Sequence, residues 1–578
     1  MTTNSKTPKQ HAIAQFNRLK NRGIAEGFRV TVIDGVGYDR AREISNSRPE
    51  FDYQPWAVAY PRNAEQVATC LKFCQTHKDI EGQTFGLRIR SGGHQHEAMC
   101  SADNVLIVRL SEMNTIVYPD PVKRDTAWLP VGKKLQEAYY EVGLHGKVIP
   151  GGGCQSVNPG GLIHGGGWGW ATRMYGLTCD SVIEVEVVLA NGNIVRANAN
   201  NAYQDLFWAV RGGGGGNFGI VTRFLIKLSP LKKDGHLTWF AELGRKDLTK
   251  VEVEQFVAAY LEIQAKFPHE LTTAAAVRVK NPDRSNGLHP VTIAGRYYGP
   301  KSDLKTLLEP LKLYLKGDLW AQPERAPLGA GSGRLLGFSA SLAEMEPQNY
   351  LEEYIHELDA ALGDFLYPSA PVMSPALSGA QDAEGEKEKR ITKPPASTCD
   401  APHPHKISSA FPLADSDAAD KQANYAKIAR AAADFFDQTN RSKEAWKPYQ
   451  SASLYLVLHG LGATQKANSA VKNFAPAETA FFWRNKDVIF QWQAWWSDPA
   501  NPKEEEFLKW IAAGRAALSG PNLVEGACIN FVDKNLDLAA YYGKAKGASN
   551  LPRLKQIKAK YDPNKVFWFD EKLSIPPE

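Results

Sequence analysis

The sequence predicts an α+β or α/β fold with more than one domain, and three observations support this. At 578 residues the chain is longer than one hydrophobic core usually supports. From about residue 50 to about residue 230, short β-rich runs alternate with clusters of glycine, whereas from about 235 to about 525 longer amphipathic helices dominate. The composition, with 43% hydrophobic and 23% charged residues, is that of an ordinary globular protein.

The first region contains both kinds of element. Alternating or continuous apolar runs predict strands at GLRIR (86–90), NVLIVRL (104–110), AWLPVG (127–132) and IVTRFLIKL (220–228). Helical periodicity predicts helices over 64–78, 134–142 and 202–210. A hairpin is expected over 181–197, because the dipeptide Asn191-Gly192 suits a type I′ turn.

The second region is expected to form a sheet covered by helices. Helices are predicted over 250–267, 349–362 and 419–438, with β-rich stretches over 289–299 and 451–460 between them. Residues 378–398 are charged, contain proline and predict a mobile surface loop. Near the end of the chain, NLPRLKQIKAKYDPNKVF (550–567) predicts a short helix that carries Leu551, Leu554, Ile557 and Tyr561 and stops at Asp562-Pro563.

Charge and hydropathy exclude several classes of partner. The net charge is +5 and the basic residues are interspersed with acidic ones, so nucleic acid is not an expected partner. No run of 18 apolar residues is present, so no membrane span is expected. The polar start lacks the apolar segment of a secretory signal, which makes the cytoplasm the default location; a leader removed ahead of this start would instead indicate secretion.

The seven cysteines do not suggest a disulfide framework in a chain of this length. Cys70 and Cys74 lie in a helical pattern in which Val67, Leu71 and Cys74 share a face, so we interpret both cysteines as buried thiols. The odd count leaves one cysteine for a special role.

Three glycine clusters, at 151–153, 160–169 and 212–216, are candidate ligand-binding loops. Glycine lets backbone N–H groups turn toward a phosphate or the edge of a ring. None of the clusters continues into the Gly-Lys-Ser/Thr of an ATP loop, and none fits the fingerprint of a classical dinucleotide fold. Glycines spread over three loops suit a long cofactor that is held from several sides.

The stretch IRSGGHQHE (89–97) places His94 and His96 two residues apart. They are not part of a His-Glu-x-x-His helix, and no nearby cysteine pair completes four ligands, so we expect no metal site. His94 in SGGH and Cys154 in PGGGC stand out among the glycines. From the residues alone, each is either functional or a simple turn histidine and buried thiol.

Taken together, the motifs resemble the berberine-bridge-enzyme-like branch of the vanillyl-alcohol-oxidase flavoprotein family. The resemblance rests on RSGGH (90–94), PGGGCQSVNPGGLIHGGGWGWATRMYGL (150–177), DLFWAVRGGGGGNFGIVT (205–222) and YYG…NLPRLKQIKAKYDPNKVF (541–567). It implies a two-part PCMH-type FAD-binding domain made of residues 1–234 and the segment 526–578. Residues 235–525 would form the inserted substrate domain, with an antiparallel sheet covered by helices.

The resemblance implies FAD attached at two points, His94 to the 8α-methyl carbon and Cys154 to C6 of the isoalloxazine. We expect further cofactor contacts from the glycine-rich motifs, namely from Arg90, Ser91, Gly92, Gly93, Gln95, Gly152, Gly153, Val157, Gly160, Gly161, Gly165, Gly166, Gly219 and Ile220. In the family, a valine three residues after the cysteine is typical of the enzymes that admit oxygen to the flavin. Val157 therefore favours an oxidase.

His96 occupies a position where sugar-oxidising relatives often carry an aromatic residue, in the pattern Gly-Gly-His-x-aromatic-Glu. We interpret His96 as filling this position structurally. Those relatives also carry a Tyr-x-Asn-Tyr motif whose second tyrosine is the base. The matching stretch here runs from Cys528 to Phe531, and Trp168 replaces another common tyrosine. A transferable tyrosine base is thus absent.

The candidate pocket residues are Trp168, Trp483, Cys528, Asn530 and Phe531, and most of them are apolar or aromatic. The favoured hypothesis is an FAD-linked oxidase of an aromatic or hydrophobic alcohol-type small molecule, with O2 as acceptor and H2O2 as product. A carbohydrate oxidase that forms a lactone with a base other than tyrosine is the alternative. A flavin-carrying protein without catalysis is a third hypothesis from another class.

Overall fold

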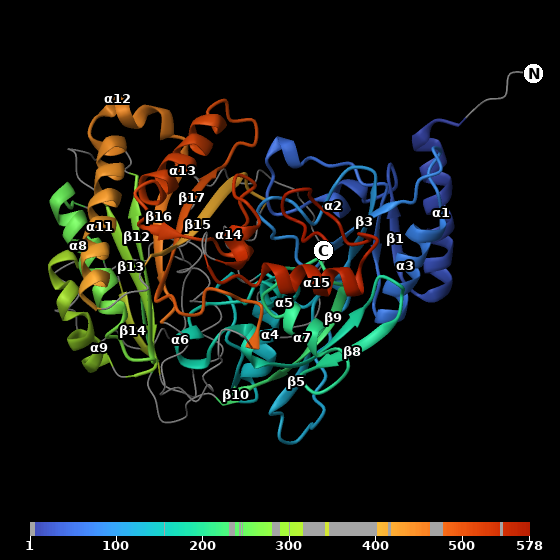
Figure 1. Ribbon diagram of the computed structural model, residues 1–578, viewed down its shortest axis with the longest axis horizontal. Helices are drawn as coiled ribbons and strands as arrows, with labels where there is room; N and C mark the ends of the chain where they lie inside the picture. Colours follow the sequence, from blue (N-terminus) through green and yellow to red (C-terminus); the bar gives the residue numbers. More distant parts are fainter. Residues whose placement is uncertain are drawn as a thin grey trace, which may run out of the picture.

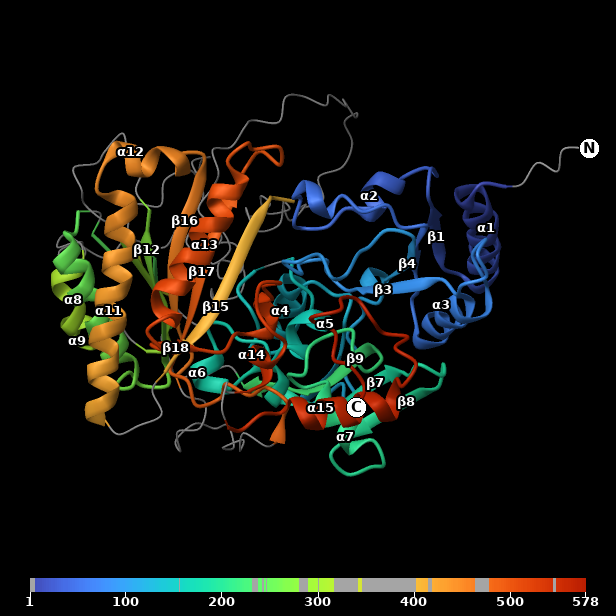
Figure 2. The ribbon, with the colours of Figure 1, turned by 45° about the horizontal axis from the view of Figure 1, so that its top comes forward.

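The computed structural model describes residues 6–154, 156–230, 237–241, 244–245, 247–279, 290–299, 301–315, 341–345, 402–413, 418–462, 478–543 and 547–578. Two bodies lie side by side, and the last segment of the chain packs on the body that contains the N-terminus (Figures 1 and 2). Each body has its own cluster of buried apolar side chains. The predicted helix 349–362 and the predicted loop 378–398 lie outside the described residues.

The N-terminal body begins with a small mixed sheet. In the described residues its strand order is β1-β2-β4-β3, with β1 antiparallel to β2 and the other pairs parallel. The strands are β1 (Arg29–Val32), β2 (Ala57–Tyr60), β3 (Gly86–Arg90) and β4 (Val105–Arg109). Helices α1 (Pro8–Glu26) and α3 (Ala64–Thr76) pack on it, while α2 (Tyr38–Arg42) follows β1. Cys70 and Cys74 are buried on α3, as the helical pattern predicted.

A second, antiparallel sheet follows, with the strand order β5-β9-β7-β8 in the described residues. Its strands are β5 (Thr126–Pro130), β7 (Val182–Val188), β8 (Ile194–Asn198) and β9 (Ile220–Lys227). The short pair β6 (Lys147–Val148) and β10 (Ser229–Pro230) lies beside it, and the helices of this part of the chain are α4 (Leu135–Gly143), α5 (Pro159–His164), α6 (Thr172–Tyr175) and α7 (Gln204–Ala209).

The predicted hairpin over 181–197 is present as β7 and β8, but the predicted type I′ turn is wrong. Such a turn needs positive φ at both central residues, and only Gly192 has it, at φ 85°. The N–H of Gly192 donates to the carbonyl of Leu189, and the N–H of Leu189 donates to the carbonyl of Asn193. The loop therefore has three residues, Ala190 to Gly192, and the glycine supplies the left-handed position at its end.

The second body is built on one large antiparallel sheet. Its order in the described residues is β14-β11-β13-β12-β16-β17-β15-β18. The strands are β11 (Leu237–Ala241), β12 (Leu271–Arg278), β13 (Val291–Tyr297), β14 (Ser341–Met345), β15 (His405–Pro412), β16 (Ala452–Gly460), β17 (Val488–Trp496) and β18 (Val524–Glu525). β15, β16 and β17 are buried or nearly buried throughout, so both of their faces are covered.

Helices cover the outer face of this sheet (Figure 1). They are α8 (Lys250–Gln264), α9 (Lys301–Leu308), α11 (Ala418–Asn440), α12 (Lys443–Trp446) and α13 (Glu504–Ser519). A capping box between Thr249 and Glu252 starts α8. Phe490, Trp492 and Trp496 of β17 point toward the helices and join their core. The alternate residues of the strand therefore face the N-terminal body.

The C-terminal segment returns to the N-terminal body through α14 (Ala539–Tyr542) and α15 (Leu551–Tyr561). Lys558 anchors it: its Nζ lies 2.6 Å from Asp562 Oδ2 and donates to the carbonyls of Asn217 (2.7 Å) and Phe567 (2.8 Å). Neither side chain of the Lys558–Asp562 pair is exposed. This buried ion pair ties the end of the chain to the loop that follows the third glycine cluster.

We predict that Asp562→Ala lowers the free energy of unfolding by about 3 kcal/mol, because it leaves the buried Lys558 ammonium without its counter-charge. Urea unfolding followed by tryptophan fluorescence measures the change. Lys560→Ala is the control, because the Lys560–Asp205 pair is partly exposed to solvent and is expected to contribute less than about 1 kcal/mol. Equal losses in the two variants would contradict the prediction.

Candidate active site

A cavity of about 280 Å³ lies between the two bodies and the C-terminal segment. The loop after β3, the glycine clusters and β9 contribute one wall. β15 and β17 of the large sheet contribute another, and residues 529–532 and 567–569 of the C-terminal segment complete it. Segments more than 300 residues apart in the sequence thus form one site.

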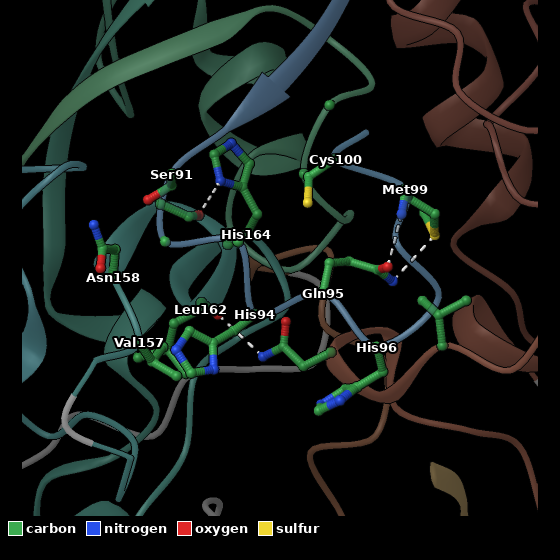
Figure 3. A pocket seen from close by; sticks show the side chains of 18 of the residues that line it. Ser91, His94, Gln95, His96, Met99, Cys100, Val157, Asn158, Leu162 and His164 are labelled. Carbon is green, nitrogen blue, oxygen red and sulfur yellow. Dashed lines mark hydrogen bonds between the residues drawn. The ribbon is translucent and has the colours of Figure 1, made fainter. Parts of the chain in front are cut away.

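His94 lies in the turn that follows β3 and lines this cavity (Figure 3). Gly93, at φ 83°, makes the turn possible. The side chain of Gln95 stabilises it by accepting from the backbone N–H groups of Glu97 (2.8 Å) and Met99 (2.9 Å). The position of His94 is therefore fixed by the backbone on both sides of it.

Arg90 is the first predicted cofactor contact that the structure places elsewhere. Its guanidinium is buried and donates to the carbonyls of Ala41 and Glu43 and to the hydroxyl of Ser101. Burial lowers the pKa of this guanidinium. Arg90 supports the loop from behind and does not line the cavity.

Cys154 and Val157 line the cavity on the loop that precedes α5. A hydrogen bond of 2.6 Å joins His94 Nε2 to Ser156 Oγ, so the imidazole of His94 lies against this loop. Figure 3 shows Val157 next to the same ring. The two predicted attachment points therefore lie on adjoining loops of one cavity wall.

Most of the predicted glycine contacts also line the cavity. The members that do so are Gly92, Gly93, Gly152, Gly153, Gly160, Gly161 and Gly219, together with Ser91 and Gln95. Gly214, Gly215 and Gly216 line it as well, although they were not among the predicted contacts. At Gly161 a Cβ atom would meet no protein atom within 4 Å, so the backbone there borders open space.

Three other predicted contacts do not line the cavity, and the packing gives the reason. A Cβ at Gly165 would collide with the side chain of Asn530, and one at Gly166 would collide with the ring of Phe481. Ile220 is fully buried in the core of β9. These residues allow close packing of other parts of the protein.

The large sheet contributes cavity residues that the sequence analysis did not identify: His405 from β15, and Gln491, Gln493 and Trp495 from β17. The three β17 residues alternate with Phe490, Trp492 and Trp496, which pack against the helices. The period-two pattern of VIFQWQAWW was a usable signal, since it places both glutamines and one tryptophan on a single face. Only the tertiary fold reveals what that face meets.

The glutamines form a connected network of hydrogen bonds. Gln493 Oε1 accepts from the hydroxyl of Tyr455 (2.9 Å) and from Trp495 Nε1 (2.9 Å), and its Nε2 donates to Gln491 Oε1 (2.8 Å). Gln491 Nε2 is buried and has no partner among the described residues. It is a donor available to an oxygen atom in the cavity.

The five predicted pocket residues divide into two groups. Trp168, Asn530 and Phe531 line the cavity, and the rings of Trp168 and Phe531 lie 5.7 Å apart. Cys528 is buried behind this wall, and burial raises the pKa of its thiol to about 11. Trp483 stacks on Phe411 within the core, with the ring centroids 5.1 Å apart. Neither Cys528 nor Trp483 is therefore part of the cavity surface.

His96 lines the cavity beside Phe531. Its ring stacks on that of Phe531, with the centroids 5.5 Å apart. Its Nδ1 lies 2.8 Å from Nε2 of His405, whose ring stacks on Trp495 at 4.1 Å. Burial lowers the pKa of His96 to about 3 and that of His405 well below the ordinary value. Both imidazoles are therefore neutral at physiological pH.

Within the described residues, no three histidine, cysteine, aspartate or glutamate side chains lie together as ligands for a metal ion. None of the described helices combines the length and apolar character needed to span a membrane.

Comparison with known proteins indicates which cofactor the protein uses. A family model described as FAD binding domain matches residues 55–198, and one described as berberine and berberine like matches residues 527–576. Both matches, and the similarity to curated relatives, support a berberine-bridge-enzyme-like FAD-linked oxidoreductase. The predicted family and the α+β fold with a PCMH-type FAD-binding domain are thereby confirmed.

Individual relatives show how far the similarity extends. The chain is 26% identical over 562 residues, 95% of this chain and 97% of the relative, to the uncharacterized FAD-linked oxidoreductase YgaK of Bacillus subtilis (strain 168). It is 34% identical over 193 residues, 32% of this chain and 33% of the relative, to monolignol oxidoreductase AtBBE-like 13 of Arabidopsis thaliana. The structure of a chitooligosaccharide oxidase superposes with a TM-score of 0.70 at 20% identity, covering 98% of this chain and all of that one.

The residues present fit FAD. The cavity is bordered by glycine backbone from three clusters, as an extended planar cofactor requires, and Gly161 leaves room where a side chain would intrude. His94 and Cys154 both reach it. FAD as cofactor agrees with the family, whereas covalent attachment through these two residues stays a prediction.

We predict that Gly161→Phe lowers the flavin content of the purified protein, because the new ring projects into the space that the cofactor needs. The ratio of flavin absorbance to protein absorbance measures the content. Gly161→Ala adds only one carbon atom at the same position and is expected to retain flavin. Full occupancy in Gly161→Phe would show that the cofactor does not pass this glycine.

Proposed function

We propose that the protein oxidises an aromatic or otherwise hydrophobic alcohol-type small molecule, with FAD linked through His94 and Cys154 and O2 as the final acceptor. The observation that carries this proposal is the aromatic part of the cavity lining, which is made of Trp168, Trp495 and Phe531. No tyrosine is among the described residues of the lining. Aromatic side chains that line a cavity favour a planar, apolar substrate.

When bound, FAD supplies the hydride acceptor, at N5 of its ring, and its reoxidation by O2 yields H2O2. The protein's own residues bind and orient the substrate. The rings of Trp168 and Phe531 give it an apolar face to lie on, and Gln491 Nε2 offers a hydrogen bond to its oxygen. The 34% identity to a monolignol oxidoreductase over a third of the chain supports an aromatic alcohol.

Carbohydrate oxidation is the second candidate, and Gln491 and Gln493 favour it. Two amides on one strand can bind the hydroxyl groups of a sugar. The fold shared with a chitooligosaccharide oxidase agrees with this alternative. The aromatic lining and the absence of tyrosine from its described residues support the first candidate over it.

A substrate panel tests the choice. Purified flavin-loaded enzyme is incubated in air with benzylic and cinnamylic alcohols, with hexoses and with chitooligosaccharides, and peroxide is measured. We expect peroxide from the aromatic alcohols. Peroxide from the sugars alone would support the carbohydrate oxidase, and no peroxide from any alcohol would support a flavin carrier without catalysis.

Covalent attachment is tested by denaturing the protein with acid. We expect the flavin to remain with the polypeptide and to be found by mass spectrometry on peptides that contain His94 and Cys154. His94→Ala and Cys154→Ala should each keep one link, and the double variant should release all flavin. Release of flavin from the wild type would contradict the double linkage.

We predict that Val157→Leu slows reoxidation of the reduced enzyme by O2 at least about tenfold, because the larger side chain narrows the cavity beside His94. Stopped-flow mixing of the photoreduced enzyme with oxygenated buffer measures the rate. Val157→Ala, which enlarges the same position, should reoxidise at the wild-type rate or faster. Equal reoxidation rates in all three proteins would show that Val157 does not control the reaction with O2.

A further inference from the structure

The hydrogen bonds of the His96–His405 pair determine where its protons lie. His405 Nδ1 is 2.8 Å from the carbonyl of His403, which can only accept, so this nitrogen carries the hydrogen. Because His405 is neutral, its Nε2 is then an acceptor, and His96 Nδ1 must donate to it over the 2.8 Å between them. His96 is neutral as well, so its Nε2 is left with a lone pair.

This second nitrogen of His96 belongs to a side chain that lines the cavity. None of the described residues hydrogen-bonds to it. Any aromatic residue at position 96 could stack on Phe531 as His96 does, so the stacking does not require a histidine. The imidazole additionally presents a fixed acceptor at the aromatic wall.

The pair is held rigidly by one buried amide. Asn46 Nδ2 donates to the backbone carbonyls of His96 (2.6 Å) and His405 (3.0 Å), and its Oδ1 accepts from the N–H of His405 (3.2 Å). Asn46 is 1% exposed. A single side chain thus fixes both histidine backbones, which is the arrangement that a preorganised site requires.

We propose that His96 Nε2 accepts the hydroxyl proton of the substrate, and that His405 is the positioning residue that fixes the required tautomer. The inference rests on the proposed alcohol oxidation. In that reaction the substrate O–H bond breaks, its electron pair forms the carbonyl, and the proton passes to His96. The hydride of the adjacent C–H bond leaves to the flavin, so atoms and electrons balance.

The charges around the pair are compatible with this role. Burial is the main cause of the low pKa of His96, and the neighbouring His94 and the Lys406 ammonium lower it further. Glu97 and Asp533 compensate the charge of Lys406, while Arg48 faces His405. A weak base suffices here, because an alcohol that loses hydride becomes a protonated carbonyl, a far stronger acid than an imidazolium.

The proposal predicts that the rate of flavin reduction does not fall as the pH is lowered from 8 to 5. A base with a pKa of about 3 stays unprotonated as the pH falls from 8 to 5, so its titration does not slow flavin reduction in that range. An ordinary histidine base would cause a loss of rate below about pH 6.5. Anaerobic stopped-flow at several pH values measures the rate of flavin reduction. The buried neutral base would be overturned if the wild-type rate fell below about pH 6.5 and His96→Phe lost this pH dependence.

Variants at the pair test the inference with the flavin-loaded enzyme and a substrate identified from the panel. His96→Phe keeps the stacking on Phe531 and is expected to lower the rate of flavin reduction about 100-fold or more with little change in KM. His405→Phe retains His96 and should lower the rate less, about tenfold. His145→Ala is the control, because His145 lies beside Tyr118 and does not line the cavity, and this variant should reduce its flavin at the wild-type rate.

Chemical rescue separates a proton acceptor from a structural role. His96→Ala opens space for free imidazole, which should restore part of the rate in proportion to its unprotonated fraction. The control variant should show no response to imidazole. A His96→Phe enzyme that reduces its flavin near the wild-type rate, or a His96→Ala enzyme that imidazole does not rescue, would overturn the proposal while leaving alcohol oxidation standing.

If no alcohol is oxidised, a measurement that needs no turnover still tests whether His96 Nε2 is a hydrogen-bond acceptor. In protein labelled with ¹⁵N-histidine, Nε2 of His96 should give the resonance of an unprotonated nitrogen at pH 7. This resonance should shift when a phenol donates to it, and it should be absent from His96→Phe. A protonated Nε2, or a resonance that phenol leaves unchanged, would contradict the proposed acceptor whatever the outcome of the substrate panel.

Discussion

The buried ammonium of Lys406 is the interaction on which the arrangement of the site depends. It contacts the carboxylate of Glu97 and lies 2.8 Å from Asp533 Oδ1, and all three side chains are almost completely buried. These residues belong to the loop after β3, to β15 and to the C-terminal segment. Because an unpaired buried charge is costly, the three segments are stable only when they meet. The ion cluster therefore joins the two bodies where the cavity forms.

Each member of this cluster has a cavity residue close to it in the sequence. Glu97 follows His96, Lys406 follows His405, and Asp533 comes two residues after Phe531. Adjacent residues of a strand point to opposite sides, so the ammonium on one side of β15 leaves the imidazole of His405 on the other. The charges hold the backbones in place, and the neutral rings are aligned by them. Separating the ions from the rings keeps the aromatic wall apolar.

The local parts of the site were predictable from the sequence and the distant parts were not. His94, Cys154 and most of the glycine contacts belong to short motifs whose chemistry is visible within a few residues, and the cavity is lined by them. Arg90, Gly165, Gly166 and Ile220 lie in the same motifs but serve packing, and a motif does not distinguish these two uses. Similarly, Asn191-Gly192 predicted the hairpin but not its turn, because the two backbone angles depend on how the strands pair.

His405, Gln491 and Trp495 could not be identified in this way. They are more than 300 residues from His94, and only the register between β15 and β17, which pairs His405 with Trp495, brings them to the same wall. The interpretation of His96 as a structural substitute for an aromatic residue was likewise based on local sequence alone. Its stacking partner is 435 positions ahead and its hydrogen-bond partner 309, so no local pattern could reveal the pair.

The replacement of tyrosine at the cavity also has a chemical consequence. A tyrosine base must be ionised to accept a proton, which requires nearby cations to stabilise the phenolate. A neutral imidazole needs no such charge and can stand among Phe531, Trp495 and Trp168 without the cost of burying an anion. An apolar wall and an uncharged acceptor are thus mutually compatible. The same features that make a tyrosine mechanism unsuitable here favour a hydrophobic substrate bound close to a neutral base.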